Sequence, residues 1–284
     1  MSKGSINTVT EFELNEREFR LFQEYIYQEV GISLSDKKVA LVRGRLSKRL
    51  RQLGMEDFQT YYRYLTEDQT GQEIFFLINA ISTNVTSFFR ESAQWDYLEE
   101  NLEHILGNAK GKKLRIWSAG CSTGEEPYSI AIFLKDYIKD FGQWDIKILA
   151  TDISQNALSK AQKGIYTDKD LAAMPRHMIH NNFTVIKTAS GEQKYQIHDR
   201  LRDLVLFRMF NLVYGNYSVF KNRFDLIFCR NVMIYFDPQT QQTLVSHFGK
   251  LLEKNSLLLV GHSESLTRNK EEFKLIRSSI YQRL

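Results

Sequence analysis

The sequence has 284 residues, 43% of them hydrophobic and 25% charged, and a formal net charge of +4. These values are typical of a globular protein with one large domain, or with a large domain and a small one, and they exclude a disordered chain. A net charge this small does not by itself imply a nucleic-acid partner.

Three features of the sequence concern the compartment. The two cysteines, Cys121 and Cys229, lie far apart, which favours a reducing compartment over a disulfide scaffold. Residues 1–10 are polar and do not resemble a signal peptide. No apolar run approaches the roughly 18 residues that a membrane-spanning helix needs. We therefore expect a cytoplasmic protein without membrane insertion.

The first part of the chain predicts a small helical domain at residues 15–82, after a disordered lead at residues 1–14. Apolar residues recur at helical spacing over residues 15–30, with Asn15 as the expected N-cap and Gly31 as the C-cap. Further helices are expected at residues 35–53, 57–65 and 71–81.

The second of these helices is strongly basic. Against a single acid, Asp36, it carries seven cations: Lys37, Lys38, Arg43, Arg45, Lys48, Arg49 and Arg51. Stabilising pairs on a solvated helix face would need interspersed acids, so an acidic partner surface is as good an interpretation as an ordinary solvated face. Arg45 and Arg49 also form an R-x-x-x-R pattern, which some cyclic-dinucleotide sites use but which arises by chance in any Arg-rich helix.

From residue 114 onward, strand and helix patterns alternate. Strands are expected at residues 114–117, 146–150, 224–229, 256–260 and 273–283, and helices at residues 127–140, 154–164 and 238–252. Alternating βαβ units predict an α/β fold with a mostly parallel, doubly wound sheet.

A different pattern interrupts this alternation at about residues 180–206. Short β-like runs at residues 184–186 and 194–197 predict an antiparallel hairpin inserted in the α/β domain. The third run, at residues 204–207, is consistent with the end of a central strand.

The turn after the first strand of the α/β domain is the most informative stretch. Residues 116–128 read IWSAGCSTGEEPY, which predicts a strand, a loop of small residues and the start of a helix. In an open α/β sheet a small ligand binds at the carboxyl end of such a strand. Glu125 and Glu126 disfavour a phosphate at the helix start and suit hydroxyls or a cationic group, as in S-adenosylmethionine. An ordinary βα turn, with acids complementing the helix dipole, remains open on this stretch alone.

Polar residues also follow other expected strands. Asp152 ends the second strand, and Asn211 and Asn231 follow strand-like runs, so the three could meet at one edge of the sheet and bind a nucleoside. Asp152 could instead be an acid at the start of the next helix. It lies 32 residues beyond Gly120, more than the roughly 20 of the dinucleotide fingerprint, so an NAD site is disfavoured.

Two short motifs are set aside. Residues 107–113 resemble a phosphate loop that is one residue short, and residues 261–265 resemble a nucleophile elbow that lacks its last glycine. The six histidines show no metal-ligand spacing, so we expect no metal site.

Three segments together resemble the CheR family of chemotaxis receptor methyltransferases: NVTSFFR at residues 84–90, SAGCSTGEEPYS at 118–129 and FCRNVMIYF at 228–236. The resemblance covers nearly the whole chain. It implies a Rossmann-like class I S-adenosylmethionine-dependent methyltransferase fold over residues 83–284, with the small N-terminal all-helical domain and an inserted antiparallel β-subdomain. The implied reaction methylates glutamate carboxylates of methyl-accepting chemotaxis receptors, giving methyl esters and S-adenosylhomocysteine. The implied enzyme is a monomer.

The resemblance also implies roles for individual residues. Arg90 and Tyr235 would lie nearest the reacting carboxylate as catalytic residues. Glu125 and Asp152 would hold the methionine amino end or the ribose. The residues implied in cofactor binding are Asn84, Thr86, Arg90, Ala119, Gly120, Glu125, Asp152, Asn211, Leu212, Arg230 and Asn231. Those implied in docking on the receptor are Arg43, Arg45, Lys48, Arg49 and Arg51.

The chemistry agrees with these residue types. A glutamate carboxylate is already ionised at pH 7, so no strong general base is needed. Methyl transfer from a sulfonium is an in-line displacement that depends on alignment and exclusion of water. Arg90 can hold a carboxylate through its planar fork.

One feature departs from part of the family, and two other functions compete. Members that bind a receptor's C-terminal pentapeptide carry a Gly-rich loop in the inserted β-subdomain, whereas residues 189–192 here have one glycine, so we expect a pentapeptide-independent enzyme. A non-catalytic S-adenosylmethionine-binding module of the same fold is disfavoured by the presence of Arg90 and Tyr235. A nucleic-acid methyltransferase is disfavoured because residues 230–233 lack the Asn-Pro-Pro-aromatic loop used to reach a base amine.

Overall fold

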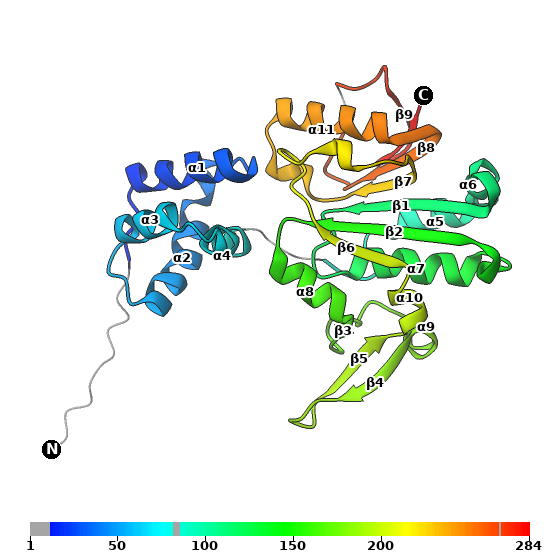
Figure 1. The fold of residues 1–284 in the computed structure, drawn as a ribbon, viewed down its shortest axis with the longest axis horizontal. Helices are drawn as coiled ribbons and strands as arrows, with labels where there is room; N and C mark the ends of the chain where they lie inside the picture. Colours follow the sequence, from blue (N-terminus) through cyan, green and yellow to red (C-terminus); the bar gives the residue numbers. More distant parts are fainter. Residues whose placement is uncertain (1–11, 82–85, 267) are drawn as a thin grey trace. The chain divides into compact units, whose positions relative to one another are not determined.

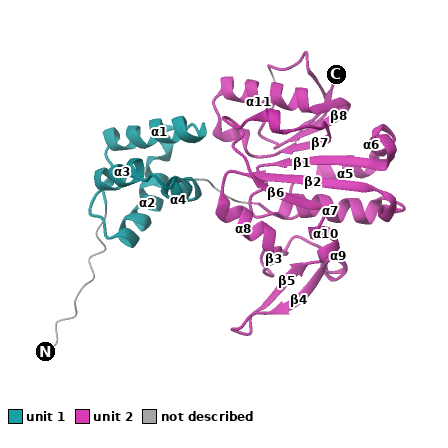
Figure 2. Cartoon of the chain, in the orientation of Figure 1, with its two compact units in different colours: residues 1–83 teal, residues 84–284 magenta. Residues whose placement is uncertain are grey.

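The structure is a computed structural model that describes residues 12–81, 86–266 and 268–284. The chain divides into two compact units, residues 1–83 and 84–284, coloured teal and magenta in Figure 2. The sequence placed this division between residues 82 and 83. Most of the expected lead, residues 1–11, lies outside the described residues.

The first unit contains the four predicted helices. They are α1 (Glu16–Val30), α2 (Val39–Leu53), α3 (Phe58–Glu67) and α4 (Gln72–Ile81), and a 3₁₀ turn (Asp36–Lys38) precedes α2. Asn15 begins α1 through a capping box, in which its side chain accepts the Glu18 N–H and the Glu18 carboxylate accepts the Asn15 N–H. The ring of Phe22 packs against Phe58 and Tyr61, so aromatic contacts join α1 to α3.

The second unit is built on a seven-stranded sheet with the order β6-β2-β1-β7-β8-β10-β9. The strands are β1 (Lys113–Ala119), β2 (Asp145–Asp152), β6 (Val205–Met209), β7 (Phe224–Cys229), β8 (Leu252–Val260), β9 (Phe273–Arg277) and β10 (Ile280–Arg283). Neighbours from β6 to β8 pair in parallel, whereas β10 pairs antiparallel with β8 and β9. The predicted mostly parallel α/β sheet is confirmed (Figure 1).

Two strand predictions were wrong. The run at residues 204–207 belongs to β6, which lies at the edge of the sheet and not at its centre. Residues 273–283 form two strands and not one, because Ser279 adopts a left-handed conformation (φ 59°) and turns the chain back. No glycine or proline marks that turn in the sequence.

Helices cover both faces of the sheet. The helices of this unit are α5 (Ser92–Glu100), α6 (Leu102–Asn108), α7 (Glu125–Tyr137), α8 (Gln155–Lys163), α9 (Arg176–Asn182), α10 (Asp199–Arg202) and α11 (Pro238–Leu251). Ile116 and its same-face neighbours pack with side chains of α5 to α8. Trp117 points to the other face and packs with α11. This alternation is what a doubly wound sheet requires. The helices α5, α6, α9 and α10 were not predicted from the sequence.

The inserted hairpin is present as β4 (Phe183–Lys187) and β5 (Gln193–Ile197), which pair antiparallel. A two-residue strand, β3 (Ile165–Tyr166), pairs with β5 and makes a small separate sheet of three strands. In the described part of the chain, no helix combines the length and apolar character that crossing a membrane requires.

Candidate functional site

The parallel strands end at one edge of the sheet. Ala119 lies opposite Thr151, Asp152 opposite Met209, and Cys229 opposite Val260. The loops that follow β1, β2, β6, β7 and β8 therefore gather at this carboxyl edge (Figure 1). Six of the predicted catalytic and cofactor-binding residues lie on these loops: Gly120, Asn211, Leu212, Arg230, Asn231 and Tyr235.

The loop after β1 is pressed against the loop after β7. The N–H groups of Gly120 and Cys121 both donate to the Thr151 carbonyl at 2.8 Å. Gly120 has φ 91°, and a Cβ at this position would collide with Val232. A glycine is therefore required, for its backbone conformation and for the space it leaves. Ala119, at the end of β1, is buried in the core beside α11.

Asp152 organises the same loop from β2. Its carboxylate accepts hydrogen bonds from the N–H groups of Ser122 and Ser154, both at 2.8 Å. Burial raises the pKa of this carboxyl, and the backbone hydrogen bonds oppose that rise. Each carboxylate oxygen can accept a second hydrogen bond, so Asp152 retains capacity for a ligand hydroxyl.

The two acids at the start of α7 have different partners. The Glu125 carboxylate accepts the hydroxyl of Thr123 at 2.7 Å, whereas Glu126 accepts the hydroxyl of Ser118 at 2.6 Å. Burial raises the pKa of both carboxyls. For Glu126 the positive charges of Arg230 and Arg90 oppose the rise. Glu126 therefore belongs to a cluster with Arg230 and Arg90 that was not predicted from the sequence.

Arg230 is the centre of that cluster, with only 2% of its side chain exposed. Its Nη2 donates to the Arg90 carbonyl. Its Nε lies 3.4 Å from Glu91 Oε2, and its Nη1 lies 3.6 Å from Glu126 Oε2. The guanidinium of Arg230, which was predicted to bind the cofactor, thus contacts three protein groups. Its hydrogen bond to the Arg90 carbonyl fixes the backbone of Arg90.

The segment that carries Arg90 is fixed at several points. The Arg90 carbonyl also accepts the indole N–H of Trp95 at 3.0 Å. The Phe89 N–H donates to Ser129 Oγ at 2.9 Å. The carboxylate of Glu91 accepts the His262 N–H at 3.1 Å. Arg90 is therefore held on a backbone that is tied to α5, α7, β7 and the loop after β8.

Four residues other than glycine adopt left-handed backbone conformations here. They are Phe89 (φ 51°), Glu91 (φ 62°), Ser122 (φ 49°) and Asn231 (φ 60°). Each such residue is strained by about 1–3 kcal/mol, and such strain is typical of functional sites. Their gathering at the carboxyl edge identifies it as the candidate site independently of the sequence motifs.

Asn231 has the clearest sign of a missing partner. Its N–H donates to Glu264 Oε2 at 2.9 Å, and its Nδ2 lies 3.5 Å from Glu91 Oε1. The buried atoms Asn231 Oδ1 and Ser122 Oγ have no hydrogen-bond partner among the described residues. Buried polar groups are normally satisfied, so these two atoms fit a polar ligand at this edge.

The remaining predicted site residues are placed as follows. The side-chain oxygen of Asn211 accepts the N–H of Val213 at 2.8 Å and closes the turn after β6. Leu212 is buried in the core. Tyr235 ends a 3₁₀ turn (Met233–Tyr235) and is partly exposed. Thr86 is also partly exposed, and Asn84 lies outside the described residues.

The basic helix α2 does not present all its cations to solvent. Arg49 donates to both oxygens of Glu73, at 2.9 and 2.6 Å, and its guanidinium lies 4.0 Å from the centroid of the Phe76 ring. Arg45 donates to the Ala80 carbonyl at 2.8 Å. Both arginines therefore bind α4. Because these contacts occupy Arg45 and Arg49, they disfavour a cyclic-dinucleotide site at the R-x-x-x-R pattern.

The other cations of α2 are more accessible. Lys48 and Arg51 are exposed, and Arg43 is partly exposed.

Two acids at the carboxyl edge, Glu91 and Glu264, were not predicted as site residues, and neither was the pairing of Glu126 with Arg230. Glu91 follows the NVTSFFR motif directly, and Glu264 lies in the segment set aside as an imperfect nucleophile elbow. Their signal in the sequence is weak because their partners lie far away along the chain. Within the described residues, no group of three or more His, Cys, Asp or Glu side chains is placed to hold a metal ion.

We expect Gly120→Ala to raise the dissociation constant for S-adenosylhomocysteine at least about 10-fold, or about 1.4 kcal/mol, because the methyl group pushes the loop away from Val232. Calorimetry measures this change. The matched control is Gly111→Ala, which also has a positive φ (65°) but no described atom within 4 Å of the added Cβ. Equal binding by the two variants would contradict the assignment of this loop.

Comparisons with known proteins agree with this geometry. Residues 17–82 match the family description "CheR methyltransferase, all-alpha domain", and residues 84–282 match "CheR methyltransferase, SAM binding domain". A "Chemotaxis protein methyltransferase" of Borreliella burgdorferi is 41% identical, and the alignment covers 86% of this chain and 87% of that protein. Proteins of the same name from Salmonella typhimurium and Escherichia coli are 39% and 38% identical, over 94% of this chain and 90% and 91% of those proteins. The chain belongs to the CheR family of chemotaxis protein methyltransferases, whose larger domain binds S-adenosylmethionine.

Proposed function

We propose that this protein transfers a methyl group from S-adenosylmethionine to glutamate side-chain carboxylates of methyl-accepting chemotaxis receptors. The products are glutamate methyl esters and S-adenosylhomocysteine. The observation that carries the proposal is the fixed backbone of Arg90, whose carbonyl accepts donors from both Arg230 and Trp95 at the carboxyl edge. A cation anchored beside the cofactor site suits an anionic acceptor.

The residues at this edge suit a reaction governed by alignment. When bound, S-adenosylmethionine supplies an electrophilic methyl group on a sulfonium. A glutamate carboxylate is ionised near pH 7 and needs no base. Arg90 orients it through the planar fork of the guanidinium, and Tyr235 orients it through its hydroxyl. A very tight clamp would stabilise the ground state, so the contribution of Arg90 is positioning in the reactive geometry.

Cofactor binding is assigned to the loops after the parallel strands. Asp152 is the residue we propose for the ribose hydroxyls, since its carboxylate retains acceptor capacity at the end of β2. Glu125 is proposed for the methionine amino end or the ribose. The unpartnered Oδ1 of Asn231 is proposed to accept a hydrogen bond from the cofactor.

The receptor-docking surface is proposed to be the exposed part of α2. Lys48 and Arg51 are exposed and Arg43 is partly exposed, so these three are proposed to meet the acidic methylated helices of a receptor. Arg45 and Arg49, which were predicted to share this role, are assigned instead to the structure of the helical unit because they bind Ala80 and Glu73. The protein is proposed to act as a cytoplasmic monomer.

The reaction is tested with labelled S-adenosylmethionine and purified receptor signalling domains. We expect base-labile label on the receptor, and we expect Arg90→Ala to lower kcat about 100-fold or more, because misplacement of the acceptor is costly. Arg90→Lys keeps the charge without the fork and should recover part of the rate.

The control for this test is Arg277→Ala, which removes an exposed arginine of β9 that pairs with Glu100 of α5. Near-normal transfer by Arg90→Ala would refute the role of Arg90. Label on no substrate would favour a non-catalytic S-adenosylmethionine-binding module, and label on nucleic acid would favour a different class of methyltransferase.

The docking surface is tested by charge reversal. The double variant Lys48→Glu and Arg51→Glu should raise KM for the receptor about 10-fold and leave kcat unchanged, because attraction between oppositely charged surfaces acts mainly on association. This effect should shrink as salt rises. The matched control reverses two exposed lysines of the sheet, Lys254 and Lys274. The assignment fails if both double variants change KM equally.

Pentapeptide independence is proposed from the turn between β4 and β5. Gly191 donates to the Thr188 carbonyl at 2.9 Å and Thr188 donates to the Glu192 carbonyl at 2.9 Å, so the turn is short and closed. We expect a receptor-tail pentapeptide to give no calorimetric binding at about millimolar concentration. A receptor that lacks its last five residues should be methylated as fast as the intact one, and tight binding of the pentapeptide would contradict this.

A further inference from the structure

Glu264 is a buried carboxylate in the loop after β8. The residue is 8% exposed. Its Oε2 accepts the N–H groups of Asn231 at 2.9 Å and Gly261 at 2.6 Å, and its Oε1 accepts the N–H of Ile234 at 3.1 Å. One side chain therefore bonds both ends of the turn that follows β7.

That turn needs an external acceptor. Asn231 has φ 60°, and the N–H groups of Asn231 and Ile234 point to Glu264. Only later in the turn do backbone bonds take over, when Tyr235 donates to the Val232 carbonyl at 3.1 Å. Both hydrogen bonds are partly buried, and a backbone donor shielded from water is costly to leave unpaired, so the carboxylate stabilises this conformation of the turn.

The close approach of the two loops depends on Gly261. A Cβ at Gly261 would lie 2.8 Å from the Asn231 nitrogen and 2.9 Å from Glu264 Oε2. No side chain fits between them without displacing the loops. Gly261 thus leaves the space in which the turn after β7 approaches, and Glu264 accepts the hydrogen bonds of that turn.

The alternative is that Glu264 binds a ligand directly. It lines a hollow of about 470 Å³ between α11 and its own loop, together with Met233, Gln241 and Arg268. A ligand-binding acid would direct free lone pairs into the hollow. Here three backbone N–H groups already bind the two oxygens, and only Oε1 retains capacity for a further bond; this favours a role in holding the turn.

We propose that Glu264 is a positioning residue that fixes the turn from Asn231 to Tyr235, and so sets Asn231 toward the cofactor and Tyr235 toward the acceptor carboxylate. The part that concerns Tyr235 rests on the proposed function. The part that concerns Asn231 depends only on binding of the cofactor, and not on the identity of the methyl acceptor. The two parts can therefore be tested separately.

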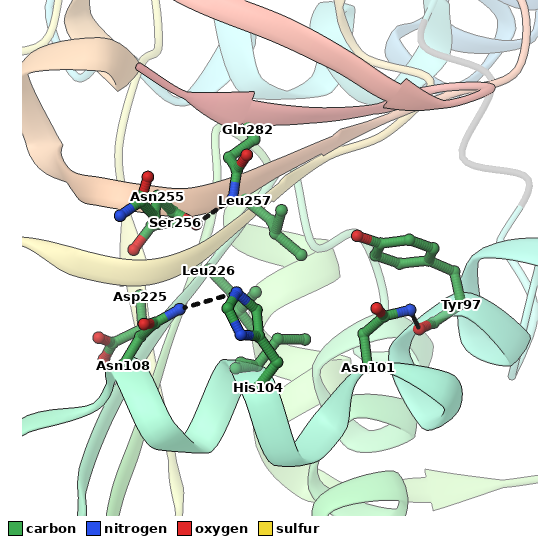
Figure 3. Close-up of a pocket in the computed structure, with 11 residues that line it drawn as sticks. Tyr97, Asn101, His104, Asn108, Asp225, Leu226, Asn255, Ser256, Leu257 and Gln282 are labelled. Carbon is green, nitrogen blue, oxygen red and sulfur yellow. Dashed lines mark hydrogen bonds between the residues drawn. The ribbon is translucent and has the colours of Figure 1, made fainter.

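The structure offers a matched control at the opposite end of the sheet. Asp225 is the second residue of β7 and accepts the Arg115 N–H at 2.7 Å, so it is also a carboxylate that holds a backbone donor. Burial raises the pKa of its carboxyl, as it does for Glu264. Figure 3 shows Asp225 lining a small polar pocket of about 20 Å³ with residues that include His104 and Asn108. Nothing in the proposed reaction uses that pocket.

The experiment compares Glu264→Gln, Glu264→Asp and Asp225→Asn in the full chain. Glu264→Gln keeps the size of the side chain but turns an NH₂ group toward backbone donors. We expect it to raise the dissociation constant for S-adenosylhomocysteine about 10-fold and to lower kcat about 100-fold, with KM for the receptor unchanged. Glu264→Asp keeps the charge at shorter reach and should recover part of both losses. Asp225→Asn should lower the melting temperature while both functional constants stay at the wild-type values.

The outcomes separate the proposal from the proposed function. If the wild-type protein methylates no receptor, binding of S-adenosylhomocysteine still decides the role of Glu264. Wild-type affinity in Glu264→Gln overturns the proposal, and so do equal losses in Glu264→Gln and Asp225→Asn, which would indicate general loosening. If Glu264→Gln does not fold, Glu264→Asp takes its place, and its wild-type binding and kcat would also overturn the proposal.

Discussion

The guanidinium of Arg230 is almost completely buried, and the arrangement of the carboxyl edge depends on how its charge is satisfied. A buried charge is tolerated only where it is paired and hydrogen-bonded. Arg230 donates a hydrogen bond to the Arg90 carbonyl and forms ion pairs with Glu91 and Glu126, although its buried Nε makes no hydrogen bond within the described part of the chain. These groups come from the segment before α5 and from the first turn of α7, while Arg230 itself directly follows β7. Satisfying one charge therefore fixes three separate segments, one of which carries Arg90.

The strained residues of the site follow the same logic. Phe89, Ser122 and Asn231 all have positive φ, and each donates its N–H to a side-chain oxygen. The acceptors are Ser129 Oγ, Asp152 Oδ2 and Glu264 Oε2, respectively. A strained backbone persists only when its surroundings compensate for the strain. Side-chain acceptors supply that compensation at three places around one edge, so the cofactor loops are held in shape by polar bonds as well as by the core.

Local signals in the sequence were sufficient for much of the fold and for part of the site. The capping of α1, the glycine loop after β1 and the position of Asp152 all depend on residues close together in the chain. The arginine cluster could not be predicted in this way, because Arg230 and Arg90 are separated by 140 positions. The pairing of Arg49 with Glu73 spans 24 positions and joins two helices, so α2 looked more available to a partner than it is.

The same limit explains the errors in the strands. A strand at the edge of a sheet and a strand at its centre differ in their neighbours and need not differ in their own residue pattern. The position of β6 in the sheet could therefore not be predicted from its residues. The turn before β10 is made by Ser279 with a positive φ, without a glycine to signal it. The role of Glu264 could not be predicted for a related reason. Its carboxylate accepts hydrogen bonds from backbone N–H groups about 30 residues earlier in the chain.

The acids at the carboxyl edge are engaged in scaffold contacts, and this has a consequence for the chemistry. Glu91, Glu126, Asp152 and Glu264 each bind donors of the protein itself. An acceptor hydroxyl or amine carries a proton and needs a base to remove it. A glutamate carboxylate reacts in the ionised form that it already has at neutral pH. The carboxylates that hold these loops are therefore compatible with the glutamate acceptor that we propose, because that acceptor needs no base.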